Sequence, residues 1–320
     1  MYIILVVIMS TFINLFGYSS LDHYAVNFDE SLGKKDPYFN TYYQTLSKRP
    51  SQWNKNLRKY SGAQIVQFCR SLYDKNNLSK TVPDDKPRIP LIIHQIWLGS
   101  PLPEKYKKWQ EAWQSMPDFE YKLWTDKDVE KLNLISKNIY EKSKNYGQKA
   151  DILTAEILYQ FGGIYIDIDL ECLQPEMFAL LNRCYDFYIG LHPLDLWVIE
   201  AGHAIMASIK GHPYFEGYLK DLPKRWADSK NKVNNVATHN LLTSGPGFFA
   251  DLIISYLDKG TKDIVFPPTF FYPLGYAQVR KLSRQGLDFE AIKKKVLKPE
   301  SVAIHWWDGN WLKPNAQLKG

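Results

Sequence analysis

The stretch GGIYIDIDLEC (162–172) constrains the fold and chemistry of this chain more than any other. Apolar residues alternate with other residues from position 164 to 169, and a period of two predicts a strand with one buried face. Asp167 and Asp169 then project from the same face, about 7 Å apart at ~3.3 Å per residue. Adjacent carboxylates repel unless a cation or a proton lies between them. The pattern is thus suited to hold a divalent ion, although an Asp-x-Asp pattern taken alone favours a solvated or helix-capping pair.

Strands alternate with helices around this stretch, which predicts an α/β fold with a largely parallel sheet. A continuous apolar strand is expected at 91–99, a second strand at 120–126, and a helix at 148–163 that Gly162 and Gly163 end before the aspartate-bearing strand. In parallel sheets, ligands bind at the carboxyl ends of the strands. Asp167 and Asp169 are expected at that end of theirs.

The remaining chain divides into three predicted parts. Residues 1–20 carry no charge and are mostly apolar, which predicts a signal or membrane segment and a membrane-associated or exported protein, with a buried helix as the alternative. Residues 21–85 form a helical and irregular extension with one helix near 62–74. The proline-rich segment 81–90 is expected to link it to the main domain, residues 86–320.

Charge and cysteine content exclude several classes of protein. The net charge of +6 is scattered along the chain, and its densest run, Lys293 to Lys295, is interpreted as a solvated helix face. No nucleic-acid partner is therefore expected. The three cysteines lack zinc-site spacing, and buried free thiols are favoured over a Cys172–Cys184 disulfide.

Several segments, in this order and spacing, resemble the family-32 glycosyltransferases. These segments are IPLIIHQIWLG, YKLWTD and KADILTAEILYQFGGIYIDIDLEC, with looser agreement in IHWWDGNW near the C-terminus. The family includes fungal α-mannosyltransferases and sphingolipid mannosyltransferases, and is related to the glucosylating domain of large clostridial toxins. The resemblance covers about residues 88–320 and implies a GT-A type nucleotide-diphospho-sugar transferase fold. It implies retaining transfer of a hexose (mannose, glucose or galactose) from a UDP- or GDP-sugar to a glycan, glycolipid or protein acceptor.

The resemblance also assigns roles to individual residues. Trp97 matches the aromatic residue that stacks on the nucleotide base, Asp151 the aspartate that holds donor-sugar hydroxyls, and Tyr165 a neighbour of the diphosphate. From the residues alone, Trp97 is equally a core aromatic, Asp151 a charge near a helix N-terminus, and Tyr165 a cross-strand packing partner. Asp167 and Asp169 would hold Mn²⁺ or Mg²⁺ and carry the catalytic role.

The block IHWWDGNW (304–311) adds further candidates. His305 is expected to complete the metal shell, while Asn310 and Trp311 close over the diphosphate. The alternative is an aromatic cluster that packs on the domain without touching a ligand.

Two departures from the family pattern affect the donor site. Thr154 stands where relatives have an arginine that contacts the donor, and His203 stands where they commonly have an asparagine. Either the donor differs, or activity is weakened. A catalytically weak or inactive nucleotide-sugar or carbohydrate-binding protein is therefore the second hypothesis. A two-metal phosphohydrolase is disfavoured because no further Asp/His ligand clusters are present.

Overall fold

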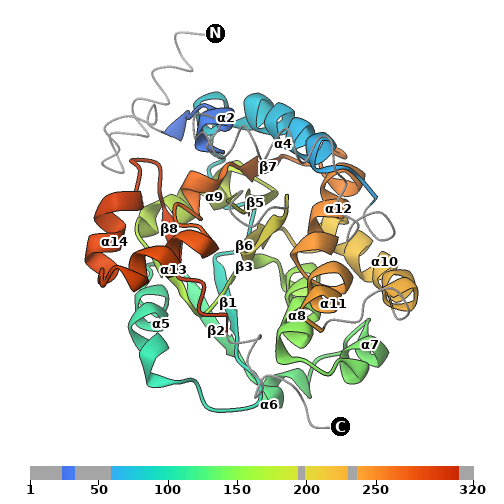
Figure 1. Ribbon diagram of the computed structural model, residues 1–320. Helices are drawn as coiled ribbons and strands as arrows, with labels where there is room; N and C mark the ends of the chain where they lie inside the picture. Colours follow the sequence, from blue (N-terminus) through green and yellow to red (C-terminus); the bar gives the residue numbers. More distant parts are fainter. Residues whose placement is uncertain (1–23, 33–58, 194–198, 230–235, 310–320) are drawn as a thin grey trace.

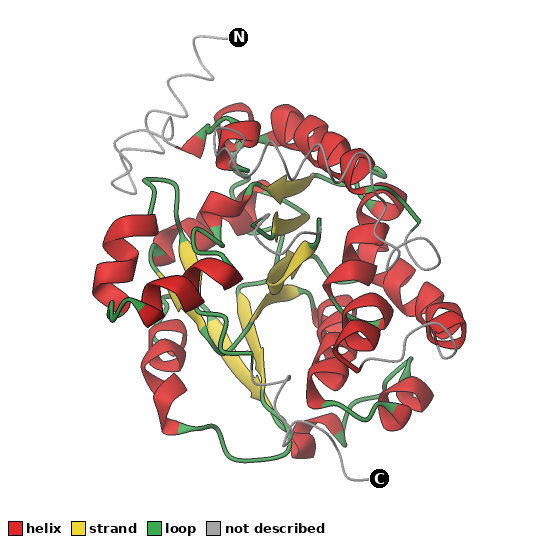
Figure 2. Ribbon diagram, in the orientation of Figure 1, coloured by secondary structure: helices red, strands yellow, loops and turns green. Residues whose placement is uncertain are grey.

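A six-stranded mixed sheet forms the centre of the computed structural model, which describes residues 24–32, 59–193, 199–229 and 236–309. Figures 1 and 2 show the sheet between two groups of helices. Three of its pairings are parallel, and β6 runs antiparallel to both of its neighbours. The predicted α/β class is confirmed. The strand order is β2 (Glu120–Trp124), β1 (Ile92–Ile96), β3 (Gly163–Ile166), β6 (Ala201–Ser208), β5 (Phe187–Leu191) and β7 (Asp263–Phe266).

Helices cover both sides of this sheet. In Figure 1, α8, α10, α11 and α12 lie together on the right, and α5, α9, α13 and α14 lie on the left. The helix bounds are α2 (Phe28–Ser31), α4 (Gly62–Asn76), α5 (Lys107–Gln114), α6 (Asp126–Val129), α7 (Lys137–Lys142), α8 (Tyr146–Phe161), α9 (Pro175–Cys184), α10 (Pro213–Ser229), α11 (Val236–Thr243), α12 (Pro246–Tyr256), α13 (Tyr276–Arg284) and α14 (Phe289–Val296).

The single strand expected over 162–172 is in fact two strands separated by a turn. β3 ends at Ile166, and β4 (Leu170–Cys172) pairs antiparallel with β8 (Ala303–His305) in a second, two-stranded sheet. The amide of Asp167 still donates to the carbonyl of Ala204 in β6, at 2.8 Å, but the amide of Leu170 donates back to the carbonyl of Asp167. The chain therefore leaves the main sheet at Asp167, so the two aspartates lie in a turn and do not share a strand face.

Helix α8 delivers the chain to β3, as predicted, with bounds shifted by two residues. Asn145 caps its N-terminus by accepting hydrogen bonds from the amides of Gly147 and Gln148. At the other end, Gly162 and Gly163 have φ values of 69° and 100°. A Cβ on Gly163 would lie 2.6 Å from the carbonyl oxygen of Ile92 in β1. Only glycine therefore allows β3 to start so close to β1.

The described part of the N-terminal extension packs directly on the main sheet. Helix α4 lies against β7 and α12, and begins with a capping box formed by Ser61 and Gln64. Its buried residues belong to the same hydrophobic core as the strands. The segment 81–90 is anchored to α9, because the amide of Arg88 donates to the carbonyl of Asn182 at 2.8 Å. The domain boundary near 85 stays a prediction.

The predicted membrane segment and the predicted free cysteines can be compared with the structure only where the chain is described. Residues 1–20 lie outside it, and among the described helices none has the length and apolar character needed to span a bilayer. Cys69, Cys172 and Cys184 are free thiols, as expected.

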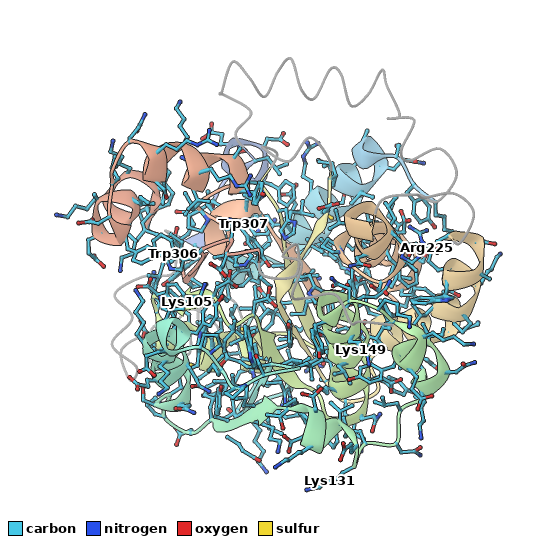
Figure 3. All side chains as sticks on the ribbon, turned by 60° about the horizontal axis from the view of Figure 1, so that its bottom comes forward. Lys105, Lys131, Lys149, Arg225, Trp306 and Trp307 are labelled. Carbon is cyan, nitrogen blue, oxygen red and sulfur yellow. The ribbon has the colours of Figure 1, made fainter. Side chains whose placement is uncertain are left out.

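The chain after β8 returns to the left-hand helices. Figure 3 shows Trp306 and Trp307 beside the ribbon of α13 and α14. Trp307 has a ring contact with Tyr276 of α13 at 6.1 Å, and Trp306 has one with Phe289 of α14 at 4.5 Å. This return places the end of β8 next to the turn that carries the aspartates.

Candidate metal and sugar-nucleotide site

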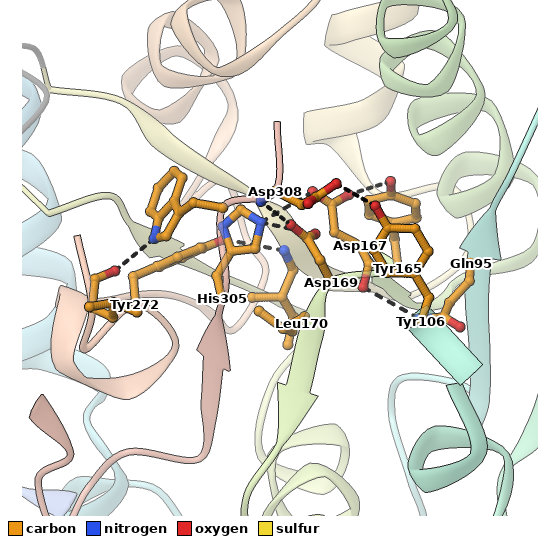
Figure 4. A network of polar contacts seen from close by, with 12 residues as sticks. Gln95, Tyr106, Tyr165, Asp167, Asp169, Leu170, Tyr272, His305 and Asp308 are labelled. Carbon is orange, nitrogen blue, oxygen red and sulfur yellow. Dashed lines mark hydrogen bonds and ion pairs between the residues drawn. The ribbon is translucent and has the colours of Figure 1, made fainter. Parts of the chain in front are cut away.

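Asp167, Asp169 and His305 form a cluster at the end of β3. One ligand atom from each lies within 4.8 Å of the others. His305 reaches the turn because β8 pairs with β4, with Leu170 opposite His305 in the register. Its Nε2 is 3.1 Å from Oδ1 of Asp169 and 3.9 Å from Oδ2 of Asp167 (Figure 4). The structure brings together the three residues predicted as metal ligands.

The charges of this cluster are unequal. Burial, together with the charge of Asp169, raises the pKa of Asp167 to about 6, against the opposing effects of His305 and Tyr165. Burial also acts to raise the pKa of Asp169, but His305 and the amide of Asp308 outweigh it and hold that pKa below its usual value. The pKa of His305 is raised, because the attraction of Asp169 exceeds the effect of burial. The His305 imidazole thus faces both carboxylates, and Asp169 favours its protonated form.

The loop after β8 holds Asp169 in place through two backbone amides. The amide of Asp308 donates to Oδ2 of Asp169 at 2.8 Å, and the amide of Trp306 donates to the Asp169 carbonyl at 3.1 Å. Asp308 is held in turn by Lys105, at 2.8 Å, and by the hydroxyl of Tyr106. Sequence reasoning missed Asp308 and Lys105, although Asp308 lies within the block IHWWDGNW.

Tyr165 orients the other aspartate. Its hydroxyl donates to Oδ1 of Asp167 at 2.6 Å, and the side-chain amide of Gln95 in β1 donates to the Asp167 carbonyl at 3.3 Å. Burial raises the pKa of Tyr165 well above its ordinary value, with the charge of Asp167 acting in the same direction. Tyr165 therefore stays a neutral donor at physiological pH.

Asp151 lies on α8, between two polar residues from other elements. Its Oδ2 accepts a hydrogen bond from Ser244 at 2.8 Å, and its Oδ1 is 3.3 Å from Nε2 of His203 in β6. Burial raises the pKa of Asp151, and lowers that of His203 to about 3. The His203 ring also packs on Tyr165, at 5.5 Å between centroids. The two predicted donor residues thus adjoin the metal cluster, and Ser244 is a third member that sequence reasoning missed.

Thr154 is placed differently from the other candidates. Its side chain is fully buried, and its hydroxyl donates to the carbonyl of Ala150 one turn earlier in α8, at 2.9 Å. The hydroxyl also interacts with Tyr165. Thr154 thus supports Tyr165 from within the core and has no exposed surface in this conformation.

Trp97 lies at the edge of the site, next to η3 (Glu104–Tyr106). It is half-buried, and its ring centroid is 5.4 Å from that of Tyr106, whose hydroxyl holds Asp308. Its indole nitrogen donates to Ser100 and to the carbonyl of Pro101, both at 3.2 Å. One part of the ring therefore remains accessible. The candidates Asn310 and Trp311 lie outside the described residues.

The cluster fits a divalent ion by the chemistry of its donors. Two carboxylates and an imidazole converge, and the Asp167 side chain is 30% exposed, so a ligand can enter from solvent. Nδ1 of His305 is buried and has no hydrogen-bond partner among the described residues. A divalent ion would bind His305 through a deprotonated ring nitrogen, so its binding would compete with protonation of the imidazole.

Comparisons with known proteins agree with this site. Residues 103–185 match the family described as a glycosyltransferase sugar-binding region containing a DXD motif. Inositol phosphoceramide mannosyltransferase 2 of Schizosaccharomyces pombe is 32% identical over 194 residues, which cover 58% of this chain and 51% of that protein. Inositol phosphoceramide mannosyltransferase 3 of the same organism is 31% identical over 146 residues, covering 42% of this chain and 38% of that protein. The chain therefore spans about half or less of these relatives' length.

A solved structure titled PaToxG Glycosyltransferase has a TM-score of 0.41 and 18% sequence identity, covering 75% of this chain and 88% of that chain. The matched family region contains Asp151, Tyr165, Asp167 and Asp169. The predicted resemblance to DXD glycosyltransferases is confirmed for residues 103–185, and the GT-A type of the α/β fold stays a prediction.

Proposed function

We propose that this protein is a metal-dependent retaining glycosyltransferase, because residues 103–185 match the family described as a glycosyltransferase sugar-binding region containing a DXD motif. It transfers a hexose from a UDP- or GDP-sugar to an acceptor hydroxyl. Mannose is the favoured hexose and an inositol-bearing glycolipid the favoured acceptor, because the similar fungal proteins are named inositol phosphoceramide mannosyltransferases. The convergence of Asp167, Asp169 and His305 carries this proposal.

Mn²⁺ is the ion that these donors suit best. Carboxylates suit both Mg²⁺ and Mn²⁺, while an imidazole ligand favours the transition metal. Asp167, Asp169 and His305 would hold it. When bound, the ion supplies Lewis-acid stabilisation of the leaving diphosphate, worth several kcal/mol in comparable sites.

The protein's own side chains position the donor. Tyr165 fixes the rotamer of Asp167 through its 2.6 Å hydrogen bond, and the Asp308 amide fixes Asp169. Asp151, held by Ser244 and His203, presents a carboxylate for sugar hydroxyls. Trp97 offers its accessible ring to the base. We assign no side chain as a covalent nucleophile, so the departing phosphate itself would help deprotonate the acceptor hydroxyl on the same face of the sugar.

Localisation follows from a different part of the chain. We propose that residues 1–20, which carry no charge, direct the protein to a membrane or into the secretory pathway. Cell fractionation tests this: full-length, uncleaved protein found wholly in the cytoplasmic fraction contradicts it.

A donor screen tests the activity. Purified protein with Mn²⁺ is incubated with UDP- and GDP-hexoses, with and without glycolipid acceptor, and nucleotide release is measured. We expect release with one donor class, its loss in EDTA, and its loss in Asp167→Asn and Asp169→Asn. Asp74→Asn, an exposed aspartate on α4, is the matched control. Metal-independent turnover contradicts the metal role. Donor binding without turnover favours the alternative of a nucleotide-sugar-binding protein.

A further inference from the structure

The segment from α13 through α14 concentrates positive charge. Residues 276–300 contain seven lysines and arginines and three acidic residues, a net charge of +4 within a chain of net charge +6. The acidic residues are already engaged: Asp288 caps α14 by accepting from the amide of Ala291, Glu290 pairs with Lys293, and Glu300 is buried. The remaining basic side chains therefore lack local compensation.

Helix α13 presents its charges on one outward face. Leu282 is buried and Val279 packs on a hydrophobic cluster, so one side of the helix faces the protein. Arg280, Lys281 and Arg284 are exposed on the opposite side, where Arg284 lies one turn after the other two. Among the described residues, none of the three forms an ion pair, although Arg280 lies over the ring of Tyr276 at 4.4 Å.

Helix α14 extends this surface and adds an apolar side chain. Lys294, Lys295 and Lys298 are exposed. Phe289, at the start of α14, is 45% exposed, and Lys108 of α5 lies 4.2 Å from its ring centroid. An exposed aromatic ring among lysines is typical of surfaces that enter the lipid headgroup region, where the ring inserts and the cations meet phosphates.

The basic surface is attached to the metal site. Tyr276 of α13 contacts Trp307, and Phe289 contacts Trp306, in the loop that holds Asp169. Lys293 of α14 donates to Glu171 at 2.8 Å, two residues after Asp169. In Figure 1, α13 and α14 lie together at the left of the molecule, next to β8.

We propose that the α13–α14 segment (residues 276–300) is a docking surface for anionic phospholipid membranes. The occupant is argued from charge complementarity and from Phe289: each basic residue near an anionic bilayer strengthens binding about fivefold, and an exposed ring flanked by lysines suits the lipid headgroup region. This surface is separate from residues 1–20. It would orient the site toward lipid-borne acceptors, but membrane binding itself requires no turnover.

Vesicle flotation of the full chain tests the proposal. The probe is phosphatidylcholine vesicles with about 25% phosphatidylserine, compared with pure phosphatidylcholine vesicles, at low and high salt. The test variant is Arg280→Gln/Lys281→Gln/Arg284→Gln. The control is Lys131→Gln/Lys142→Gln/Lys144→Gln, which removes the same charge from exposed positions around α6 and α7; Lys131 lies far from α13 in Figure 3.

We expect a salt-sensitive component of binding that favours anionic vesicles, beyond any salt-insensitive binding through residues 1–20. This component should fall about 100-fold in the α13 variant and change little in the control, since three charges contribute about fivefold each. Melting temperatures establish that both variants fold. Binding of a single-stranded oligonucleotide is measured in parallel. Three outcomes overturn the proposal: no preference for anionic vesicles, equal losses of vesicle binding in the two variants, or a loss of oligonucleotide binding with unchanged vesicle binding. The donor screen tests the proposed activity and the vesicle assay tests membrane docking. Either hypothesis can therefore fail without affecting the result for the other.

Discussion

Asp167→Asn is expected to stabilise the metal-free protein while abolishing transfer. The pKa of Asp167 is raised from 3.8 to about 6 by burial and by Asp169. A shift of about two units corresponds to ~3 kcal/mol. Because the side chain is 30% exposed, water screens part of this, and we expect about 1–3 kcal/mol. Asparagine keeps the oxygen that accepts from Tyr165 and removes only the charge.

The sign of the effect depends on pH. The folded state keeps the proton of Asp167 up to about pH 6, while the unfolded state releases it near its ordinary pKa. Wild-type stability therefore falls as pH rises through this interval, and the variant escapes that loss. The difference should be near zero at about pH 4 and complete above about pH 7.

Thermal melting in EDTA measures this difference. For a chain of this size, 1–3 kcal/mol corresponds to roughly 2–6 °C. We expect the variant to melt higher than wild type at pH 7.5, with the gap closing in acid, whereas Asp74→Asn shows no pH-dependent gap. Added Mn²⁺ should stabilise wild type and reverse the order. A variant that melts lower than wild type at pH 7.5 in EDTA would refute the reasoning.

Three further variants test the surroundings of the cluster. Trp97→Ala should raise the donor KM by about 5- to 100-fold, because base stacking contributes ~1–3 kcal/mol; a fall in melting temperature with unchanged KM would show that the ring is structural. Tyr106→Phe should raise the Mn²⁺ concentration for half-maximal activity roughly tenfold, because it removes a hydrogen bond to the charged Asp308. The control Tyr256→Phe loses a similar bond to Asp221 and should leave this concentration unchanged. Thr154→Arg should lower the melting temperature by many degrees, because the site is fully buried, while Thr154→Ser keeps the bond to Ala150. A stable Thr154→Arg protein with an altered donor ranking would place Thr154 at the sugar after all.

The sequence predicted the strand that carries the aspartates but not its interruption. The alternation of apolar and other residues continues through Ile168, although β3 ends at Ile166. A period of two therefore does not show where pairing with the neighbouring strand stops. The amide of Asp167 makes the last bond to β6, at the carbonyl of Ala204, and the break follows in the turn that the amide of Leu170 closes on the carbonyl of Asp167. Both contacts are hydrogen bonds between backbone groups. Almost any residue type can form them, so the sequence does not mark their positions.

The proposed metal ligands were easier to predict from the sequence than the groups that hold them in place. Carboxylate and imidazole side chains identify metal ligands by their chemistry, which is why His305 could be predicted despite its distance in sequence from Asp169. Its position depends on the β4–β8 pairing. The Asp308 contact uses a backbone amide, and no residue type marks such a donor. Similarly, the interaction of Thr154 with Tyr165 could not be read from helical spacing, which places residues on a face without showing whether that face is buried.

The two aspartates are supported differently, and this assigns them different parts in the proposed reaction. Asp169 is contacted by Nε2 of His305 at the end of β8 and by the amide of Asp308 in the loop that follows. Asp167 has Tyr165 and stays partly open to solvent. Asp167 would therefore be the solvent-facing ligand of a bound cation, and Asp169 and His305 would be its enclosed ligands. Because the same loop contacts Asp169 and, through Asp308, is tied to Lys105 and Tyr106, binding at the cluster and the position of the loop must depend on each other. Loss of the Tyr106 hydroxyl should consequently weaken the metal site, although Tyr106 is not itself a ligand.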